Sequence, residues 1–331
     1  MRCARRFGML AAAAYAAVSG GTAGLVKAAP PEFAAVVGAD GPVLWYRFNE
    51  APGATSIVNS GSLGAAYDGL APNGLTLGVA SAAGDSAARF SAPLQQYVES
   101  AAVVPASLTG NPTFTAEVVV RVEGAATLWP PFLHWGGNTT GTSVYFSLRQ
   151  NETNRFYAGF YNSGLRSVCK ISTRADAWYH VVWVRDSAGG TADSLSGSTL
   201  YVNGEPVSTT RDEFLFGAIV PNVTATTFRI QRATDFTRYF TGEIDEVALY
   251  GRALGPDEVR EHFETLAFPL SLKFCPADFT GDCLVDDSDF VIFAASYAAF
   301  TDTRADLNDD GFTDDTDFVL FAQAYDAFTC E

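Results

Sequence analysis

The chain has 331 residues, enough for two domains, and 48% of them are apolar, which excludes wholesale disorder. Its formal net charge of −16 repels polyanions, so nucleic acid and anionic membrane surfaces are poor partner candidates and divalent cations are better ones. The 30 Gly and 15 Pro, with abundant β-branched and aromatic residues, favour short strands and tight turns over a helical bundle.

Residues 1–28 are typical of a secretory signal peptide. Three arginines precede the apolar stretch MLAAAAYAAVSGGTAGLV, and Val26, Lys27 and Ala28 offer a small-residue cleavage site. A membrane anchor is the alternative, but the apolar run is short and rich in glycine, and no later stretch is long enough to span a bilayer. We therefore expect an exported protein, secreted or associated with the cell surface, with no transmembrane anchor.

Residues 41–266 are typical of short strands separated by turns. The strand-like segments are VLWYRFN (43–49), TFTAEVVVRVE (113–123), SVYFSLR (143–149), RFYAGFYN (155–162), WYHVVWVRD (178–186), STLYVNG (198–204), TFRIQR (227–232) and YFTGEIDEVALY (239–250). Apolar and polar side chains alternate in several of them, which predicts half-buried antiparallel strands. Asn203 and Gly204 predict a tight hairpin, and Pro256 predicts the start of one helix with Val259 and Phe263 on one face. We expect a mainly β fold, an antiparallel two-sheet jelly-roll sandwich.

The same segments resemble a known family. FTGEIDEVALYGRALGPDEV (240–259), the pair WYHVVWVRD and LYVNGEPV, and the opening WYRFNE (45–50) are similar to a laminin-G-like, or concanavalin A-like, jelly-roll domain. The resemblance covers nearly all of residues 41–266. It implies a sandwich that often binds carbohydrate or protein ligands, and it does not specify the ligand.

A second unit follows a short predicted linker at 267–274. Residues 275–331 contain thirteen Asp and one Glu against a single Arg, and they hold an internal repeat: FTGDCLVDDSDFVIFAASYAAF (279–300) matches LNDDGFTDDTDFVLFAQAYDAF (307–328) at an offset of 28. Equivalent aromatic stripes recur at Phe290, Phe293, Tyr297 and Phe300 and at Phe318, Phe321, Tyr325 and Phe328. Such stripes lie on one helical face, so the repeats should pack on each other as a small all-α domain.

The second repeat has the spacing of an EF-hand-type calcium loop. Oxygen-bearing side chains stand at loop positions 1, 3, 5, 9 and 12, namely Asp306, Asn308, Asp310, Asp314 and Asp317. A chain that wraps a hard cation must present six or seven oxygens at roughly two-residue intervals. Phe312 at position 7 would offer its carbonyl, and Gly311 at position 6 permits a turn with positive φ. A merely solvated acidic loop is the alternative.

The first repeat departs from that pattern at two positions. Asp278, Asp282, Asp286 and Asp289 hold positions 1, 5, 9 and 12, with Leu284 at position 7. Thr280 stands at position 3 and Cys283 replaces the glycine at position 6, where left-handed backbone costs a non-glycine residue about 1–2 kcal/mol. We expect two calcium ions, with the first loop binding more weakly.

Two calcium loops, each followed by one helix and each with Asp at position 12, resemble a dockerin module over 275–331. The resemblance implies calcium-dependent docking to a cohesin-type partner, in which recognition centres on loop positions 10 and 11. Here those positions are Asp287 and Ser288 in the first loop and Asp315 and Thr316 in the second. Helix capping is the alternative role for these four residues.

Four cysteines follow the predicted signal peptide, an even number that permits disulfides in an exported chain. Cys275 and Cys330 bracket the repeats, and antiparallel packing of the repeats would bring the ends of the module together. We expect these two to form a disulfide that adds about 4 kcal/mol in the chain-entropy model. Cys169 and Cys283 remain either free or bridging.

The segment EIDE (243–246) is the strongest candidate for a catalytic motif. Jelly-roll glycoside hydrolases of the laminarinase type carry Glu-x-Asp-x-x-Glu or Glu-x-Asp-x-Glu, and a retaining mechanism needs its two carboxyl groups about 5–5.5 Å apart. Here apolar residues occupy the positions of the second Glu, and Glu243 and Glu246 would face opposite sides of a regular strand. A structural role is favoured, with Asp245 a candidate for a further calcium site.

The remaining candidates carry weaker signals. His134, His180 and His262 show no metal-ligand spacing and are expected to be ordinary core or surface residues. Trp129, His134 and Trp135 could form an aromatic sugar platform, although core packing is the favoured interpretation.

The sequence thus predicts an exported, non-catalytic binding protein. Its jelly roll would bind a polysaccharide or an extracellular protein, and its dockerin-like tail would dock to a cohesin-type partner when calcium is bound. Two alternatives stay open: a glycoside hydrolase of polysaccharide breakdown delivered by the tail, and a structural surface protein with a calcium-stiffened terminus.

Overall fold

The structure is a computed structural model that describes residues 32–124, 129–149, 155–168, 178–212, 217–234, 238–266, 277–280, 284–299, 305–308 and 310–327. The predicted signal peptide, the predicted linker at 267–274 and every cysteine lie outside these residues, and with them the predicted Cys275–Cys330 disulfide.

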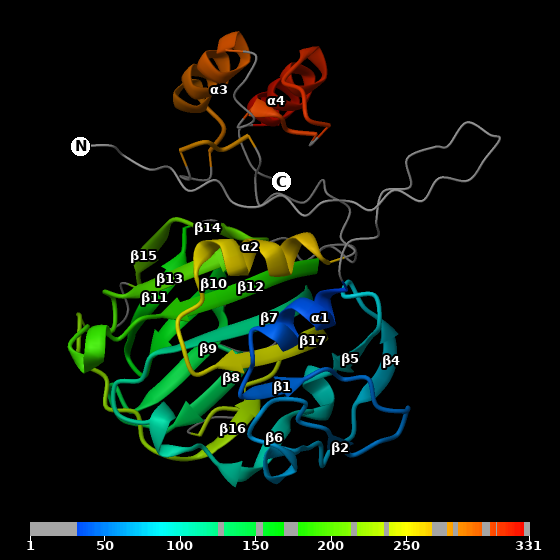
Figure 1. The fold of residues 1–331 in the computed structure, drawn as a ribbon, viewed down its shortest axis with the longest axis vertical. Coiled ribbons are helices and arrows are strands. Elements are labelled where there is room, and N and C mark those ends of the chain that lie inside the picture. Colours follow the sequence, from blue (N-terminus) through cyan, green and yellow to red (C-terminus); the bar gives the residue numbers. More distant parts are fainter. Residues whose placement is uncertain are drawn as a thin grey trace, which may run out of the picture. The chain divides into compact units, whose positions relative to one another are not determined.

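The described residues of the jelly-roll region form two antiparallel sheets (Figure 1). Sheet A contains, in spatial order, β14 (Glu205–Pro206), β13 (Ser198–Val202), β12 (Trp178–Arg185), β7 (Phe114–Gly124), β17 (Thr241–Tyr250), β5 (Ser86–Phe90) and β4 (Thr76–Ala80), with β1 (Leu44–Tyr46) paired to β17. Sheet B contains β15 (Thr209–Arg211), β11 (Ser163–Ser167), β10 (Arg155–Phe160), β9 (Ser143–Arg149), β8 (Pro131–Gly136), β16 (Thr227–Ile230), β6 (Val98–Val103), β3 (Gly69–Leu70) and β2 (Ser56–Ile57). The predicted mainly β, two-sheet sandwich is confirmed.

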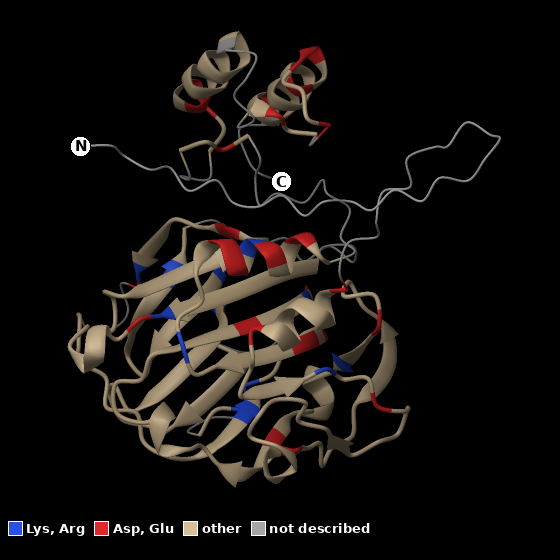
Figure 2. Ribbon diagram, in the orientation of Figure 1, with Lys and Arg blue, Asp and Glu red and all other residues tan. Residues whose placement is uncertain are grey.

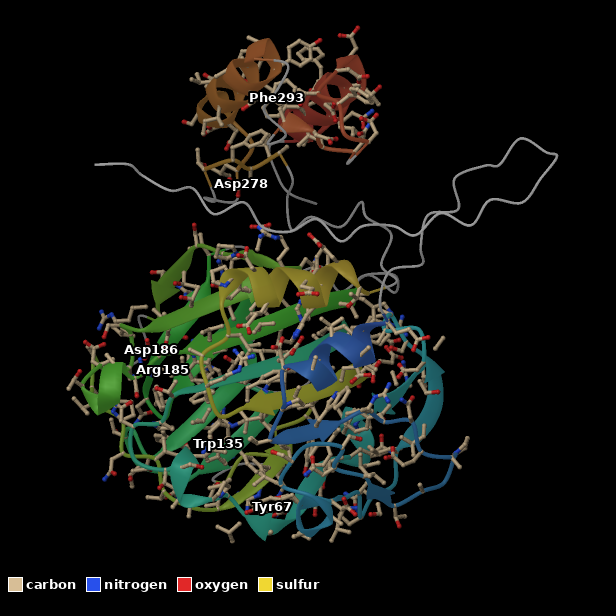
Figure 3. All side chains as sticks on the ribbon, viewed as in Figure 1. Tyr67, Trp135, Arg185, Asp186, Asp278 and Phe293 are labelled. Carbon is tan, nitrogen blue, oxygen red and sulfur yellow. The ribbon has the colours of Figure 1, made fainter. Side chains whose placement is uncertain are left out.

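The main core lies between the sheets because every second side chain of each strand points inward. Val118 and Val120 of β7 and Phe146 and Leu148 of β9 are fully buried there. Trp135, labelled in Figure 3, packs edge-to-face on Phe114 and donates its indole N–H to a backbone carbonyl. Trp135 is therefore a core residue, as the favoured interpretation of the sequence held.

Two short helices lie across the outer face of sheet A (Figure 1): α1 (Phe33–Ala39) and α2 (Pro256–Glu264). Phe33, Val37 and Val259 are buried in a second cluster with Trp45 and Tyr250 of the sheet. Helix α1 precedes residue 41, so the packed unit includes residues before the predicted start of the domain.

The hairpin turn and the helix start that single residues predicted are both observed. Asn203 and Gly204 have φ of 52° and 83° and join β13 to β14, as the hairpin prediction required. Helix α2 begins at Pro256, and the Glu258 carboxylate accepts the Gly255 N–H at 2.6 Å. Short 3₁₀ turns occur at Ala65–Tyr67, Ala92–Leu94, Ala106–Leu108 and Ala188–Gly190.

The C-terminal repeats each form one helix, α3 (Asp287–Ala299) and α4 (Asp315–Ala327). Equivalent residues Phe293 and Phe321 stack on each other with ring centroids 4.6 Å apart, and Phe293 lies between the helices in Figure 3. Phe290 and Phe318 remain 44% and 46% exposed, so the predicted stripe is buried only in part. Phe300 and Phe328 lie outside the described residues.

Acidic residues recur on α2, α3 and α4 (Figure 2). None of the helices in the described ranges combines the length and apolar character needed to cross a bilayer.

Candidate functional site

The second acidic loop is organised around two carboxylates, those of Asp306 and Asp317. Gly311 N donates to Asp306 Oδ2 at 2.9 Å, and Gly311 has the predicted positive φ, 89°. Asp317 is fully buried at the start of α4 and accepts from Leu307 N at 2.7 Å and Asp314 N at 2.8 Å. Asp317 therefore joins the beginning of the loop to its end.

Three other predicted ligands shape the loop through their own backbone. Asn308 Oδ1 accepts the N–H of Asp310, and Asp310 Oδ1 accepts the N–H of Phe312, both at 2.9 Å. Asp314 Oδ1 accepts the N–H of Thr316 at 2.8 Å and caps α4. The Phe312 side chain is 72% exposed, which suits a residue predicted to contribute only its carbonyl.

The first loop repeats this arrangement around Asp289. Asp289 is fully buried, and its two oxygens accept the N–H groups of Thr280 at 2.9 Å and Asp286 at 3.0 Å. Thr280 Oγ1 donates to Asp278 Oδ1 at 3.3 Å, and the Leu284 side chain is exposed. The predicted ligand Asp282, like Cys283, lies outside the described residues.

The donor set of both loops fits a hard cation by its chemistry, because every predicted ligand atom is an oxygen. The carboxylates are turned toward backbone N–H groups. In the described part of the loops, no three of them bring oxygens within 4.8 Å of one another. Calcium binding would therefore draw these side chains further inward.

The predicted partner-binding residues are all exposed at the helix starts: Asp287, Ser288, Asp315 and Thr316. The side chains that cap the helices are instead Asp286 and Asp314, which accept the N–H groups of Ser288 and Thr316. Asp287 Oδ1 accepts the Tyr325 hydroxyl at 2.5 Å, and Asp315 accepts that of Tyr297. The two Asp residues thus join the repeats.

The outer face of sheet B carries buried polar side chains. Its residues alternate with core residues along β8, β9 and β10, and we define the sheet B outer face by His134, Ser143, Tyr145, Ser147, Arg149 and Tyr157 with the adjacent Trp129. Among the residues that the structure describes, five polar side-chain atoms of this face are buried without a hydrogen-bond partner: both ring nitrogens of His134, the Ser143 and Ser147 hydroxyls and the Trp129 indole N–H. His134, Ser143 and Ser147 are fully buried.

Aromatic rings and arginines complete this face. Tyr145 meets the His134 ring edge-on at 4.5 Å, and the Arg149 and Arg238 guanidinium groups lie 4.2 and 5.1 Å from the Trp129 ring centroid. Arg149 also pairs with the buried Asp212 at 2.5 Å. Burial first, then the neighbouring Arg229 and Arg238, hold the pKa of His134 well below its usual value, so its ring is neutral.

A bulge in β17 changes the expected facing of the EIDE segment. The pairing with β7 shifts between Asp245 and Ala248, and Glu246 has a φ of 51°. Two successive residues, Asp245 and Glu246, consequently point to the outer face of sheet A with Glu243, while Val247 turns inward to the core. The expectation of opposite faces for Glu243 and Glu246 is wrong because it assumed a regular strand.

Basic groups surround these carboxylates. Glu243 forms ion pairs with Arg89 and Arg121, each at 2.7 Å. Glu246 accepts from the Trp45 indole at 2.5 Å and Arg47 at 3.3 Å, and Arg47 also pairs with Asp85 at 2.8 Å.

Among the described residues, one group of three side chains of the kinds that bind metals (Asp, Glu, His or Cys) has its ligand atoms within 4.8 Å of one another. It consists of Asp85, Asp245 and Glu246. Burial is the main cause that raises the pKa of Glu246 to about 8; Arg47 lowers it and Asp85 raises it further. Burial and the neighbouring Glu246 also raise the pKa of Asp245 well above its usual value. Both shifts favour the protonated form of these two carboxyl groups at neutral pH.

Two histidines that seemed unrelated in sequence meet at one carboxylate beneath α1 and α2. Glu117 of β7 is buried and contacts His180 Nε2 at 2.6 Å, His262 Nδ1 at 3.0 Å and the Tyr250 hydroxyl at 2.7 Å. Asp40, next to α1, binds His262 Nε2 at 2.9 Å. No sequence signal joins these residues, since they stand on five different segments.

Several solved structures are similar to this chain at low sequence identity. Domain 4 of a GH43 extracellular arabinanase from Geobacillus stearothermophilus, in complex with arabinotriose, has a TM-score of 0.48 and 17% identity over 67% of this chain and 98% of that one. Trypanosoma rangeli sialidase has a TM-score of 0.45 and 18% identity over 67% of this chain and 32% of that one. The binding domain of botulinum neurotoxin serotype G has a TM-score of 0.41 and 11% identity, with 74% and 54% covered.

No curated protein sequence matches the chain. Residues 90–260, which are 171 of the 331, match the family model described as the concanavalin A-like lectin/glucanases superfamily. They include the strands that form most of both sheets, from β7 to β17. By that match, the chain belongs to the concanavalin A-like lectin/glucanases superfamily.

Proposed function

We propose that the protein is an exported, non-catalytic binding protein whose jelly roll holds a glycan on the sheet B outer face. The observation that carries the proposal is the set of buried polar groups there without partners, on His134, Ser143, Ser147 and Trp129. Buried polar atoms are almost always hydrogen-bonded, so several unpartnered ones on one face point to a polar ligand or to the water it displaces.

The chemistry of this face suits sugar hydroxyls. A neutral His134 offers one donor and one acceptor, and each serine hydroxyl can both donate and accept. Tyr145 and Tyr157 are 5% and 3% exposed and supply apolar surface beside these groups. A sugar presents the same combination, since its hydroxyls surround patches of C–H.

The pairing of the described carboxylates near this face supports the non-catalytic part of the proposal. Near this face, the described carboxylates are Asp212, which pairs with Arg149, and Glu99, which pairs with Arg229 and Arg232. A retaining glycosidase needs one carboxyl group as acid and another as nucleophile about 5–5.5 Å apart. The EIDE carboxylates stand on the other sheet, where Glu243 and Glu246 form ion pairs with arginines and Asp245 accepts the Ser81 hydroxyl.

Glycan binding is tested with the full chain on an array of soluble polysaccharides and their oligosaccharides, followed by calorimetry on each hit. We expect Ser147→Ala and His134→Gln to weaken binding by about tenfold, and Ser60→Ala, an exposed serine elsewhere, to leave it unchanged. Equal glycan affinity of the wild type and the three variants would show that the glycan binds elsewhere on the protein. Release of reducing ends from any bound glycan would overturn the non-catalytic assignment and favour the glycoside hydrolase alternative.

For the C-terminal repeats, we propose calcium-dependent docking to a cohesin-type partner. Gly311 in its left-handed conformation, the buried Asp289 and Asp317 that close both loops, and the all-oxygen donor set support calcium as the ligand. Bound calcium would neutralise the loop carboxylates and stabilise the module, since folding and binding are coupled.

Docking is tested by surface plasmon resonance of the full chain against a panel of cohesin domains, with calcium and then with chelator. We expect binding only in calcium, and we expect Ser288→Leu with Thr316→Leu to weaken it, while the exposed control Gln323→Leu does not. Calcium binding by calorimetry without any cohesin bound would favour the structural alternative, a calcium-stiffened terminus.

A further inference from the structure

Two crossed hydrogen bonds connect the C-terminal repeats. The Tyr325 hydroxyl of α4 donates to Asp287 Oδ1 at the start of α3, at 2.5 Å. The equivalent Tyr297 hydroxyl of α3 donates to Asp315 Oδ1 at the start of α4. Each residue stands 28 positions from its counterpart, so the same bond is made twice in opposite directions. In symmetry terms this is the pattern of an isologous interface, in which i contacts j and j contacts i.

The two acceptor carboxylates, those of Asp287 and Asp315, lie next to the residues that close each loop. Asp287 lies between Asp286, which caps α3, and the buried Asp289 that closes the first loop. Asp315 lies in the same way between Asp314 and Asp317. A displacement of either loop end therefore moves the carboxylate to which the other repeat is bonded.

The aromatic core reinforces this connection. Phe293 and Phe321, each 1% exposed, are stacked at 17°, and each lies four residues before the tyrosine of its own helix. A residue and the one four positions later share a helical face, so the stack and the tyrosine hydroxyl act on the facing helix together.

We propose that these crossed Tyr–Asp bonds couple the two cation loops, so that occupation of the second loop stabilises the first. The inference rests on the proposed calcium function and extends it to regulation between the two sites. The first loop has Thr280 and Cys283 where the second loop has Asn308 and Gly311, so we expect the first loop to have the lower affinity for calcium. An ordered second loop fixes Asp315 and, through Tyr297 and the ring stack, fixes α3, whose first residues end the first loop.

The test is a double-mutant cycle on the full chain, with calcium titrated calorimetrically into chelator-treated protein. Asp317→Asn removes a ligand from the second loop, and Tyr297→Phe with Tyr325→Phe removes both crossed bonds. Asp289→Asn with Asp317→Asn serves as the blank for calcium bound elsewhere on the chain. Asp287→Asn with Asp315→Asn keeps an acceptor oxygen for each tyrosine and is the matched control.

We expect Asp317→Asn to weaken calcium binding by the first loop about tenfold in the wild-type background, within the usual range of coupling between sites. In the double Tyr→Phe background the same substitution should leave first-loop affinity unchanged, and in the double Asp→Asn background the tenfold effect should persist.

Three outcomes overturn the proposal, and they are distinguishable. An equal effect of Asp317→Asn in both the wild-type and the double Tyr→Phe backgrounds would show that the bonds carry no coupling, although both loops bind calcium. If calcium titrated into the wild-type protein gives no more heat than calcium titrated into the blank, the two loops do not bind calcium and the proposed calcium function is itself wrong. If the double Tyr→Phe protein loses helical circular dichroism in saturating calcium, Tyr297→Phe alone replaces it, because the Tyr297 hydroxyl is the one bonded to Asp315 of the second loop. An unchanged effect of Asp317→Asn in that variant would also contradict the coupling.

Discussion

The outer faces of the two sheets treat buried polar groups in opposite ways. On sheet A, beneath α1 and α2, Glu117 is bonded to His180, His262 and Tyr250. On sheet B, His134 and Ser147 are equally buried and have no partner for their side-chain polar atoms. Burial and polarity are alike in the two places, and the extent of pairing differs: in the Glu117 network, among the described residues, His180 Nδ1 is the one side-chain polar atom without a hydrogen-bond partner.

This difference separates a structural role from a binding role. A polar group with its partners inside the protein lowers the free energy of the folded state or at least costs nothing further. A buried polar group without a hydrogen-bond partner lowers the stability of the folded state by about 1–3 kcal/mol, and a ligand that bonds to it can restore that free energy. This comparison is the basis on which we propose a structural role for the outer face of sheet A and ligand binding for that of sheet B.

The largest expected effect is at Glu117. We expect Glu117→Gln to lower the free energy of unfolding by about 3–5 kcal/mol, because it leaves two histidines and a tyrosine buried around a neutral group. Glu123→Gln on the same strand, whose carboxylate is partly exposed beside Arg89, should cost less than about 1 kcal/mol. Urea unfolding measures both, and equal costs would remove the distinction between the buried network and a surface pair.

The next prediction concerns His262. Burial of its ring opposes protonation, but the charge of Glu117 and the bonds to Glu117 and Asp40 outweigh burial and raise its pKa to about 9. The group is protonated more readily in the folded chain than in the unfolded one. Its contribution is therefore complete below about pH 6.5 and is lost as the pH rises through about 9, a change of roughly 3 kcal/mol.

Urea unfolding of wild type and His262→Gln at pH 6 and pH 10 checks this window. The difference in unfolding free energy between the two proteins should shrink at the higher pH. A constant difference would mean that His262 is neutral in the folded protein.

Glu246 sharpens the comparison within sheet A, because burial favours the protonated form of its carboxyl group despite its pairing with Arg47 and Trp45. With its folded pKa raised to about 8, the stabilisation is full below about pH 4.5 and declines as the pH rises through 8. We expect Glu246→Gln to gain roughly 4 kcal/mol relative to wild type between pH 5 and pH 9 in chelator. Thermal midpoints measured across that range test it, and parallel curves would contradict the raised pKa.

The smallest effect is expected on sheet B. Ser147→Ala should change the free energy of unfolding by less than about 0.5 kcal/mol, since no protein hydrogen bond is lost. Ser163→Ala is the matched control on the same sheet: its buried hydroxyl contacts Ser194 at 2.6 Å and a backbone carbonyl at 2.9 Å, so it should cost about 1–2 kcal/mol. If Ser147→Ala costs as much as Ser163→Ala, the hydroxyl of Ser147 is satisfied within the protein.

Much of the fold could be predicted from local pattern. Alternation identified β7, β9, β12 and β17 because each has a core face and another face, and this period survives in any sandwich. The hairpin at Asn203 and Gly204 and the start of α2 follow from backbone preferences of single residues. The repeat of 28 residues located both acidic loops, since ligand spacing is also a local property.

The candidate sites were less predictable because they depend on pairing across long distances. The bulge at Asp245 and Glu246 leaves no mark in an otherwise regular strand pattern, and it reversed the expected facing of Glu246. His180 and His262 meet only through Glu117, on another strand. The tyrosines of the repeats were identified as core residues, and nothing in their spacing indicated that their hydroxyls would reach Asp287 and Asp315.

The Phe293–Phe321 stack has a consequence for how such a module can change. A ring that packs on its own counterpart lies on the axis relating the two repeats, so one substitution made in an ancestral single copy would have altered both sides of the contact at once. After duplication into one chain each side varies alone. The present module is in this sense similar to a homodimer whose subunits are joined end to end, and its two loops already differ at positions 3 and 6, where Thr280 and Cys283 stand opposite Asn308 and Gly311.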